Sequence, residues 1–259
     1  MTNKKTPVLF VTDWGPMPAM QEDEYTRALN KVGSSIKPTA IVIMSGHWES
    51  KDILITSGDN NEIIYDYYGF PAQSYKIKYP YKGDSTLAKN IHDLLAKSKI
   101  KSELNSSRGI DHGAWVPLYR LYPDAKIPIV QISVPNIQPE KIFEIGKALT
   151  PLREQNVLII AAGSIIHNLS LALRNDKNTA PESWAINFGD WVQDKIENKS
   201  YEELFKYEHK AVNAKKAVPT PDHFNPLFFV LGASKGDDFK ILYKDIKYGN
   251  GLMLIMKFE

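Results

Sequence analysis

The sequence contains no cysteine among its 259 residues. This absence excludes disulfides, thiolate metal sites and a cysteine nucleophile, and it is compatible with a reducing compartment. An excess of charge of one sign is also missing, since 32 basic residues face 30 acidic ones and no long basic block occurs. The chain therefore lacks the electrostatic footprint of a protein that binds nucleic acid or anionic lipid. A small neutral or aromatic partner fits the composition better.

Long hydrophobic runs are missing as well. No stretch approaches the roughly 18 consecutive apolar residues that indicate a membrane-spanning helix. The apolar segment near the N-terminus, VLFV, is too short and too quickly interrupted to be a signal peptide. We therefore expect a cytoplasmic protein with no membrane partner.

Short apolar runs alternate with stretches of helical periodicity along most of the chain. Three of the runs, AIVIM, IPIVQISV and VLIIAA, are apolar almost throughout, as expected for strands that are covered on both faces. The pattern predicts an α/β fold with a mostly parallel central sheet flanked by helices on both faces. No internal repeat or low-complexity linker divides residues 1–259, so we expect a single domain. The expected strands are 8–11, 40–44, 127–134, 157–161, 239–243 and 252–258, and the expected helices are 23–32, 85–95, 114–121, 140–152, a region within 181–209, and 222–231.

Three polar residues follow predicted strands and are candidates for chemistry. Asp13 follows VLFVT, His47 follows AIVIMSG, and His167 follows VLIIAAGSII. Ligands of open parallel sheets bind beyond the carboxyl ends of the strands, so these side chains could converge on a metal ion. Each one alone could equally be a hydrogen-bonded structural residue or the cap of a turn. No compact H-x-x-x-H signature supports the metal site by spacing alone.

Two further histidines, His112 and His223, lie in predicted loops, and each follows an aspartate. Adjacent side chains usually point apart, so we do not expect Asp111 to pair with His112. Asp222 is a candidate helix N-cap. The remaining histidines, His92 and His209, have polar helical surroundings and are expected at the surface.

Five motifs then carry a resemblance to a known family. They are Gly15-Pro16-Met17 after the first strand, SGHW at 45–48, GIDHGAW at 109–115, GSIIHNL at 163–169, and PTPDHF at 219–224 followed by Pro226-Leu227. With these motifs in this order the sequence resembles the class III extradiol ring-cleavage dioxygenases of the LigB-type superfamily, specifically the branch similar to DOPA 4,5-dioxygenase. The similarity covers nearly the whole chain and includes YGFP at 68–71 and YPDAKIP at 122–128.

The resemblance implies a single catalytic domain over residues 1–259 that inserts O2 into a catechol-type, DOPA-like substrate at a non-haem metal centre. It implies that His47, His167 and His223 are metal ligands and that His112 is the acid-base residue. Fe(II) is the implied metal, and Zn(II) is the alternative because both accept these ligands. The implied partners are the catechol and O2, and the oligomeric state is not indicated.

The first strand departs from the family pattern. In the family this strand ends in Gly-His-Gly-Ser-Pro-Met, with the histidine a further ligand, whereas here residues 12–17 read TDWGPM. The Pro-Met pair aligns Asp13 with that histidine. In one interpretation Asp13 binds the metal as a carboxylate, since oxygen ligands suit Fe(II). In the other it does not reach the metal, which is then bound weakly or not at all, and the bulky Trp14 narrows the substrate pocket.

Two other functions are compatible with the same residues. A zinc-dependent hydrolase would use the histidines and carboxylate to activate a water molecule. A catalytically impaired homologue that binds a small molecule or a protein would keep only the fold. Four aromatic residues are expected either to line a pocket for the substrate ring or to pack in the core, namely Trp48, Trp115, Tyr68 and Phe70.

Overall fold

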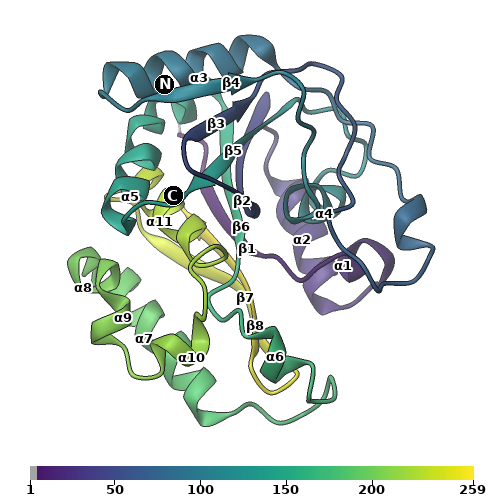
Figure 1. Cartoon of the computed structure of the whole chain (residues 1–259), viewed down its shortest axis with the longest axis vertical. Helices are drawn as coiled ribbons and strands as arrows, with labels where there is room; N and C mark the ends of the chain where they lie inside the picture. Colours follow the sequence, from purple (N-terminus) through teal and green to yellow (C-terminus); the bar gives the residue numbers. More distant parts are fainter. Residues whose placement is uncertain (1–4) are drawn as a thin grey trace.

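The computed structural model describes residues 5–259 of the chain. One eight-stranded sheet, ordered β4-β3-β5-β2-β6-β1-β8-β7, runs through the molecule, and helices cover both of its faces (Figure 1). Parallel pairing joins β1 to β6, β6 to β2, β2 to β5 and β3 to β4, whereas β8 pairs antiparallel with β1 and β7, and β3 antiparallel with β5. The predicted α/β class, with a mostly parallel sheet covered on both sides, is confirmed.

The elements follow one another in the alternating order that the sequence predicts. The strands are β1 (Val8–Thr12), β2 (Ala40–Ser50), β3 (Ile53–Thr56), β4 (Ser102–Asn105), β5 (Ile129–Pro135), β6 (Val157–Gly163), β7 (Phe239–Lys247) and β8 (Gly251–Phe258). The α-helices are α1 (Met17–Met20), α2 (Glu24–Ser35), α3 (Ser85–Lys97), α4 (His112–Leu121), α5 (Pro139–Ala148), α6 (Leu169–Ala172), α7 (Ser183–Glu197), α8 (Tyr201–Phe205), α9 (Tyr207–Lys210), α10 (Ala214–Ala217) and α11 (Asn225–Ala233). Two short 3₁₀ helices, η1 (Ser74–Lys76) and η2 (Thr150–Gln155), complete the list. In the described part of the chain, no helix is both long and apolar enough to span a membrane.

The central strands are buried on both faces, which explains their continuous apolar sequences. In β1, Val8 and Phe10 contribute to the core on one side, and Leu9 and Val11 to the core on the other. All four are fully buried. Successive side chains of a strand point to opposite faces, so a strand between two helical layers needs an apolar residue at every position.

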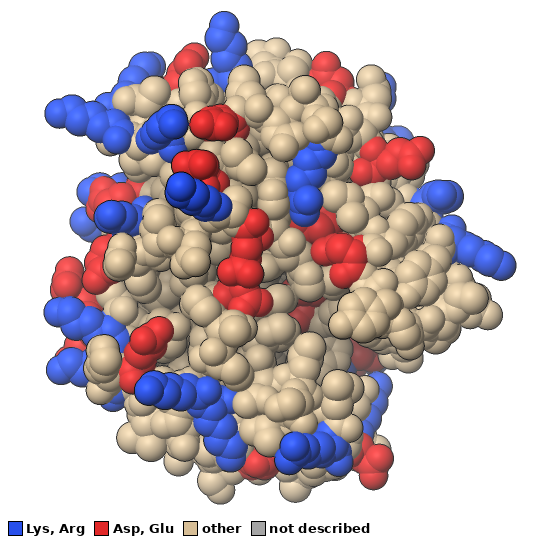
Figure 2. Space-filling view, in the orientation of Figure 1, with Lys and Arg blue, Asp and Glu red and all other residues tan. Residues whose placement is uncertain are grey.

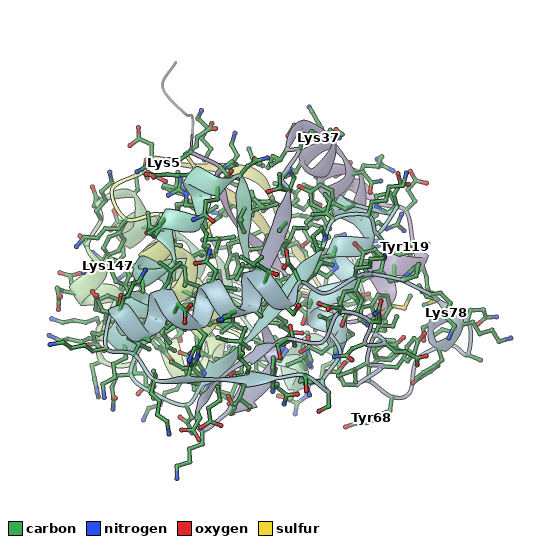
Figure 3. The ribbon with its side chains drawn as sticks, turned by 90° about the horizontal axis from the view of Figure 1, so that it is seen from above. Lys5, Lys37, Tyr68, Lys78, Tyr119 and Lys147 are labelled. Atoms are coloured by element: carbon green, nitrogen blue, oxygen red, sulfur yellow. The ribbon has the colours of Figure 1, made fainter. Side chains whose placement is uncertain are left out.

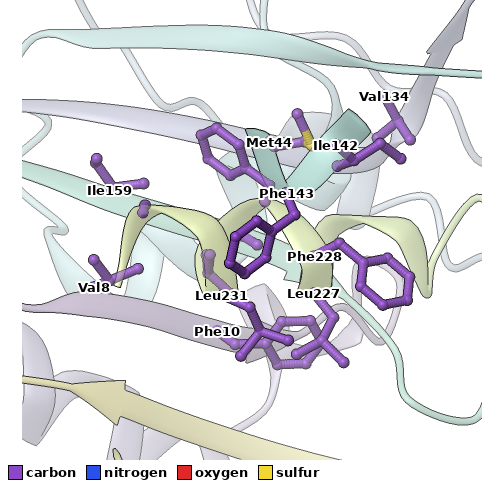
Figure 4. Packing of buried hydrophobic residues seen from close by; sticks show 14 of the residues in the cluster. Val8, Phe10, Met44, Val134, Ile142, Phe143, Ile159, Leu227, Phe228 and Leu231 are labelled. Carbon is purple, nitrogen blue, oxygen red and sulfur yellow. The ribbon is translucent and has the colours of Figure 1, made fainter. Parts of the chain in front are cut away.

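The helices that cover each face bury an apolar stripe. On the first face α5 and α11 lie across the central strands, and Figure 4 shows Ile142, Phe143 and Leu227 among the residues that pack there. On the second face α2 buries Tyr25, Leu29 and Val32, which recur at helical spacing. The two cores hold β1, β2 and β6 side by side, with their carboxyl ends at one edge of the sheet.

The structure differs from the predicted elements in several places. The short helices α1, α6 and α10 are not among the predicted ones, α11 begins at Asn225 rather than at 222, and β7 continues to Lys247. Strands β3 and β4 are not among the predicted ones, because ILIT and SELN have only four residues each and carry little periodicity. Strand β2 continues to Ser50, beyond the expected end at Met44, because after a register shift it resumes pairing with β5 at Val134 and Pro135. His47 therefore lies within the strand rather than after it.

The N-terminus of α2 is stabilised by Asp23. Its side chain accepts a hydrogen bond from the backbone N–H of Thr26 at 2.9 Å and one from Lys247 Nζ at 2.6 Å. Burial raises the pKa of this carboxyl, but the hydrogen bonds from Lys247 and Thr26 outweigh that effect and lower it below its ordinary value of 3.8.

We expect Asp23→Ala to lower the free energy of unfolding at pH 7 by about 1 kcal/mol, as for the loss of an N-cap. Because the pKa is lower in the native state, this contribution is present above the ordinary value of 3.8 and is lost as the pH falls through the native pKa. The difference in the free energy of unfolding between variant and parent should therefore become smaller in acid, as measured by chemical denaturation over a pH series. Asp124→Ala is the control, since that side chain is 74% exposed, and an equal loss there would contradict the capping role.

Candidate functional site

Asp13 lies at the carboxyl edge of the sheet, directly after β1, and its side chain is almost fully buried. Its backbone N–H donates to the carbonyl of Gly163, the last residue of β6, at 2.8 Å. One carboxylate oxygen, Oδ1, accepts a hydrogen bond from the N–H of Gly15 at 3.1 Å. The other, Oδ2, faces the ring nitrogens of His47 and His223 and has no other hydrogen-bond partner within the described chain. A buried carboxylate oxygen with no other donor needs a proton or a cation from these neighbours.

Two histidine rings face this oxygen. His47 Nε2 lies 2.8 Å from Asp13 Oδ2. His223 Nε2 lies 3.0 Å from His47 Nε2 and 3.7 Å from Asp13 Oδ2. Three potential ligand atoms from distant parts of the sequence thus form a small triangle.

Carboxylates behind the rings determine which nitrogen faces inward. Asp66 Oδ1 lies 2.9 Å from His112 Nδ1, and Asp222 contacts Nδ1 of His223. An ionised carboxylate can only accept a hydrogen bond, so the Nδ1 atom of each of these rings carries a proton. In the neutral ring the Nε2 atom then carries a free lone pair, as metal-ligating histidines require.

The triangle fits a metal ion. Ligand atoms lie about 2.0 to 2.2 Å from Zn(II) and similar ions, so ligands at right angles are about 3 Å apart. The separations of 2.8 and 3.0 Å around His47 Nε2 match that spacing. Acceptors this close repel one another unless a proton or a metal ion lies between them.

His112 and His167 flank the triangle on opposite sides. The ring of His112, at the start of α4, has its centroid 3.8 Å from that of His47, and donor atoms of Asp13, His47 and His112 lie within 4.8 Å of one another. The ring of His167 stacks on that of His223 at 3.6 Å, and these two with Asp222 form a second such group. The structure thus gathers all five residues that the sequence selects, and the contact between His47 and His223 joins the two groups.

The electrostatics favour the metal-binding ionisation state of Asp13 and His167, and they favour a protonated ring for His223. Burial raises the pKa of Asp13, but the charges and hydrogen bonds of His47 and His223 lower it well below its usual value, so the group is a carboxylate. Burial lowers the pKa of His167 to about 4, helped by the nearby His223, so this ring is neutral. Burial also lowers the pKa of His223, but Asp13 and Asp222 raise it to about 9, and a metal would replace the proton held there.

Glycines in two of the family motifs allow the side chains of Asp13, His47 and His223 to lie close together. A Cβ on Gly113, next to His112, would lie 2.7 Å from Asp13 Oδ2 and 2.8 Å from His47 Cδ2. A Cβ on Gly46 would lie 2.9 Å from His223 Cγ. Any larger residue would push the candidate ligands apart, which explains glycine at both positions.

Trp14 does not narrow the site as expected. Its ring stacks on Tyr248 at 5.8 Å and occupies the space beside Gly251, where a Cβ would collide with it. It therefore packs on the turn between β7 and β8.

Only one of the four aromatic candidates remains near the mouth of the site. Trp115 is fully buried and donates to the carbonyl of Ile64, and Trp48 is buried under the guanidinium of Arg108. Tyr68 is 91% exposed and projects from the surface (Figure 3). Phe70 approaches Gly15, beside Asp13, since a Cβ added to Gly15 would lie 3.4 Å from the Phe70 ring.

In the face shown by Figure 2, acidic side chains gather beside a central hollow.

The role of Asp222 differs from the sequence-based interpretation, whereas that of Asp111 agrees with it. Asp222 does not cap α11, whose N-cap is Phe224 without a side-chain hydrogen bond, and instead holds His223. Asp111 caps α4 by accepting from Ala114 N–H and, as expected, does not pair with His112.

Sequence reasoning missed Asp66, the partner of His112. It lies in a loop without regular structure. The available signal was a lone acidic residue in the aromatic run IIYDYYGF. The other two histidines lie outside the cluster: His92, on α3, contacts Ser102 at the start of β4, and His209 is exposed on α9.

The fold and this cluster together define the class of protein. The chain belongs to the LigB family, because the family model described as the catalytic LigB subunit of aromatic ring-opening dioxygenase matches residues 5–253. The resemblance found in the sequence is thereby confirmed.

Individual relatives agree with this assignment. A protein of Beta vulgaris named 4,5-DOPA dioxygenase extradiol is 39% identical over 250 residues, covering 96% of this chain and 90% of that protein. A protein of the same name from Escherichia coli K12 is 32% identical over 263 residues, covering 98% of this chain and 95% of that protein. A crystal structure from Escherichia coli K12, titled as that of uncharacterized protein JW3007, superposes with a TM-score of 0.81 at 31% identity and covers 98% of this chain and all of that one.

Proposed function

We propose that this protein is an extradiol ring-cleaving dioxygenase that inserts O2 into a catechol-type, DOPA-like substrate at a non-haem Fe(II) centre. The observation that carries the proposal is the meeting of three potential ligand atoms, on Asp13, His47 and His223, at separations that suit one metal ion. The relatives named 4,5-DOPA dioxygenase extradiol support the reaction and the class of substrate.

Asp13, His47 and His223 would hold the metal, and His167 beside His223 is the predicted fourth ligand. Two histidines with a carboxylate form the set that many non-haem iron oxygenases use. When bound, Fe(II) supplies a common point of attachment for the catechol oxygens and O2 and a path for electrons between them. The protein supplies the fixed positions of the ligands and the buried surroundings.

His112 is suited to move the substrate proton. Its Nδ1–H is engaged by Asp66, so Nε2 is free to accept a proton from a catechol hydroxyl and to return it later. Burial lowers the pKa of this ring, but Asp66 and Asp13 outweigh that effect and raise it above the ordinary value of 6.5. The raised pKa makes the ring a stronger base for the substrate proton.

The proposal is tested by loading metal-free protein with Fe(II) without oxygen, adding DOPA and then admitting air. A yellow ring-fission product is the expected result, and protein loaded with Zn(II), which has no redox chemistry, is the matched control. Hydrolysis of ester substrates that depends on Zn(II), with no coloured product from Fe(II), would show a hydrolase instead. Failure to take up either metal would show a non-catalytic binding protein.

We expect Asp13→Ala to lower the metal content of the protein, because it removes one of the three converging ligand atoms. Asp13→His should retain or raise the metal content, because imidazole is the residue that the family resemblance predicts at this position. Metal per chain is measured by elemental analysis after dialysis, with Asp124→Ala as the surface control. Equal metal content in Asp13→Ala and the parent would show that Asp13 is not a ligand.

We expect His112→Ala to lower kcat for ring cleavage by about 10²-fold or more, as for a lost general acid-base group, with little change in metal content. His209→Ala, on the exposed face of α9, is the matched control and should match the parent. A parallel loss of metal in His112→Ala would reassign His112 as a ligand.

A further inference from the structure

Asp66 is held rigidly although it lies in a loop without regular structure. Two residues before it, the N–H of Ile64 donates to the carbonyl of Ile110 at 2.8 Å, and the carbonyl of Ile64 accepts from Trp115 Nε1 at 3.0 Å. On its other side, the hydroxyl of Tyr67 donates to the carbonyl of Ser74 at 2.9 Å. These bonds fix the loop against the start of α4.

The two oxygens of Asp66 contact two different site histidines. Oδ1 accepts from the backbone N–H of His112 and from its ring Nδ1–H, each at 2.9 Å. Oδ2 lies 3.4 Å from Nδ1 of His47. No other carboxylate in the described chain contacts both rings, and Asp111 is occupied by the cap of α4 and by Gln131.

We propose that Asp66 is a positioning residue that fixes the ring protons of His47 and His112 on Nδ1, so that both Nε2 atoms face the centre of the site. It thereby couples a metal ligand to the residue that moves the substrate proton. Its effect on turnover rests on the proposed function, whereas its effect on the rings does not. A carboxylate is needed because both oxygens must accept.

Asparagine at this position gives a selective test, because it offers only one accepting oxygen. The backbone N–H of His112 is always a donor, so the amide oxygen must occupy the place of Oδ1. The amide NH2 then faces His47 Nδ1 and favours the proton on its Nε2, where it competes with the metal. His112 keeps its proton on Nδ1.

We expect Asp66→Asn to weaken Zn(II) binding about 10- to 100-fold, the usual cost of losing a partner behind a metal ligand, while His112 stays protonated on Nδ1. Zn(II) affinity is measured by chelator competition, and the His112 tautomer by ¹⁵N NMR of metal-free protein. Asp66→Ala should weaken Zn(II) binding and also leave the ring proton of His112 free to lie on either nitrogen. At saturating Fe(II), kcat of the alanine variant should then fall about 10-fold below that of the asparagine variant, with KM little changed.

Asp59→Asn is the matched control, because Asp59 lies in the same loop but binds the N–H of Ser85 outside the cluster. It should match the parent in Zn(II) affinity and in the His112 tautomer. Parental Zn(II) affinity in Asp66→Asn would overturn the proposal, and this variant decides the question alone if Asp66→Ala does not fold. Neither the Zn(II) affinity nor the His112 tautomer requires turnover to be measured. If the parent is inactive but the variants change these two properties as expected, only the proposed function is overturned. If the parent is active and the variants leave these properties unchanged, only the role of Asp66 is overturned.

Discussion

The structure depends on one electrostatic constraint, the burial of the ionised Asp13 carboxylate at the end of a central strand. Burying a charge without compensation costs several kcal/mol, and one oxygen of this group faces only histidine rings in the described chain. The compensation comes from the rings of His47 and His223, which are packed against it. In the proposed function, a metal ion at this point would satisfy the carboxylate and both rings together.

The sheet makes this arrangement possible because β1, β6 and β2 are parallel neighbours whose carboxyl ends share one edge. Asp13 and His167 follow two of these strands, and His47 lies near the end of the third. The loop that carries His223 is joined to the same edge, since the backbone carbonyl of His223 accepts a hydrogen bond from the N–H of Ser164 at 2.7 Å. Gly46 and Gly113 then remove the side-chain volume that would separate the ligands. Backbone pairing thus positions the groups before any metal is bound.

Carboxylates outside the triangle give each ring a definite role. Asp222 and Asp66 contact the Nδ1 atoms of His223 and His112, so Nε2 is the nitrogen that each ring can offer to a metal or a proton. The same chemical pair, an aspartate with a histidine, thus serves a predicted metal ligand in one case and a predicted proton carrier in the other. The position of the ring relative to Asp13 makes the difference.

The sequence by itself determined the alternation of strands and helices, the burial of both sheet faces, and the family, because periodicity and short motifs are local properties. It also placed Asp13, His47 and His167 at one edge of the sheet, since parallel strands share a direction. Only the tertiary structure decided that Trp14 turns toward Tyr248, that Asp222 holds His223 rather than capping α11, and that Asp66 reaches His112. Those outcomes depend on the path of irregular loops and on side-chain direction, which contacts between distant residues fix.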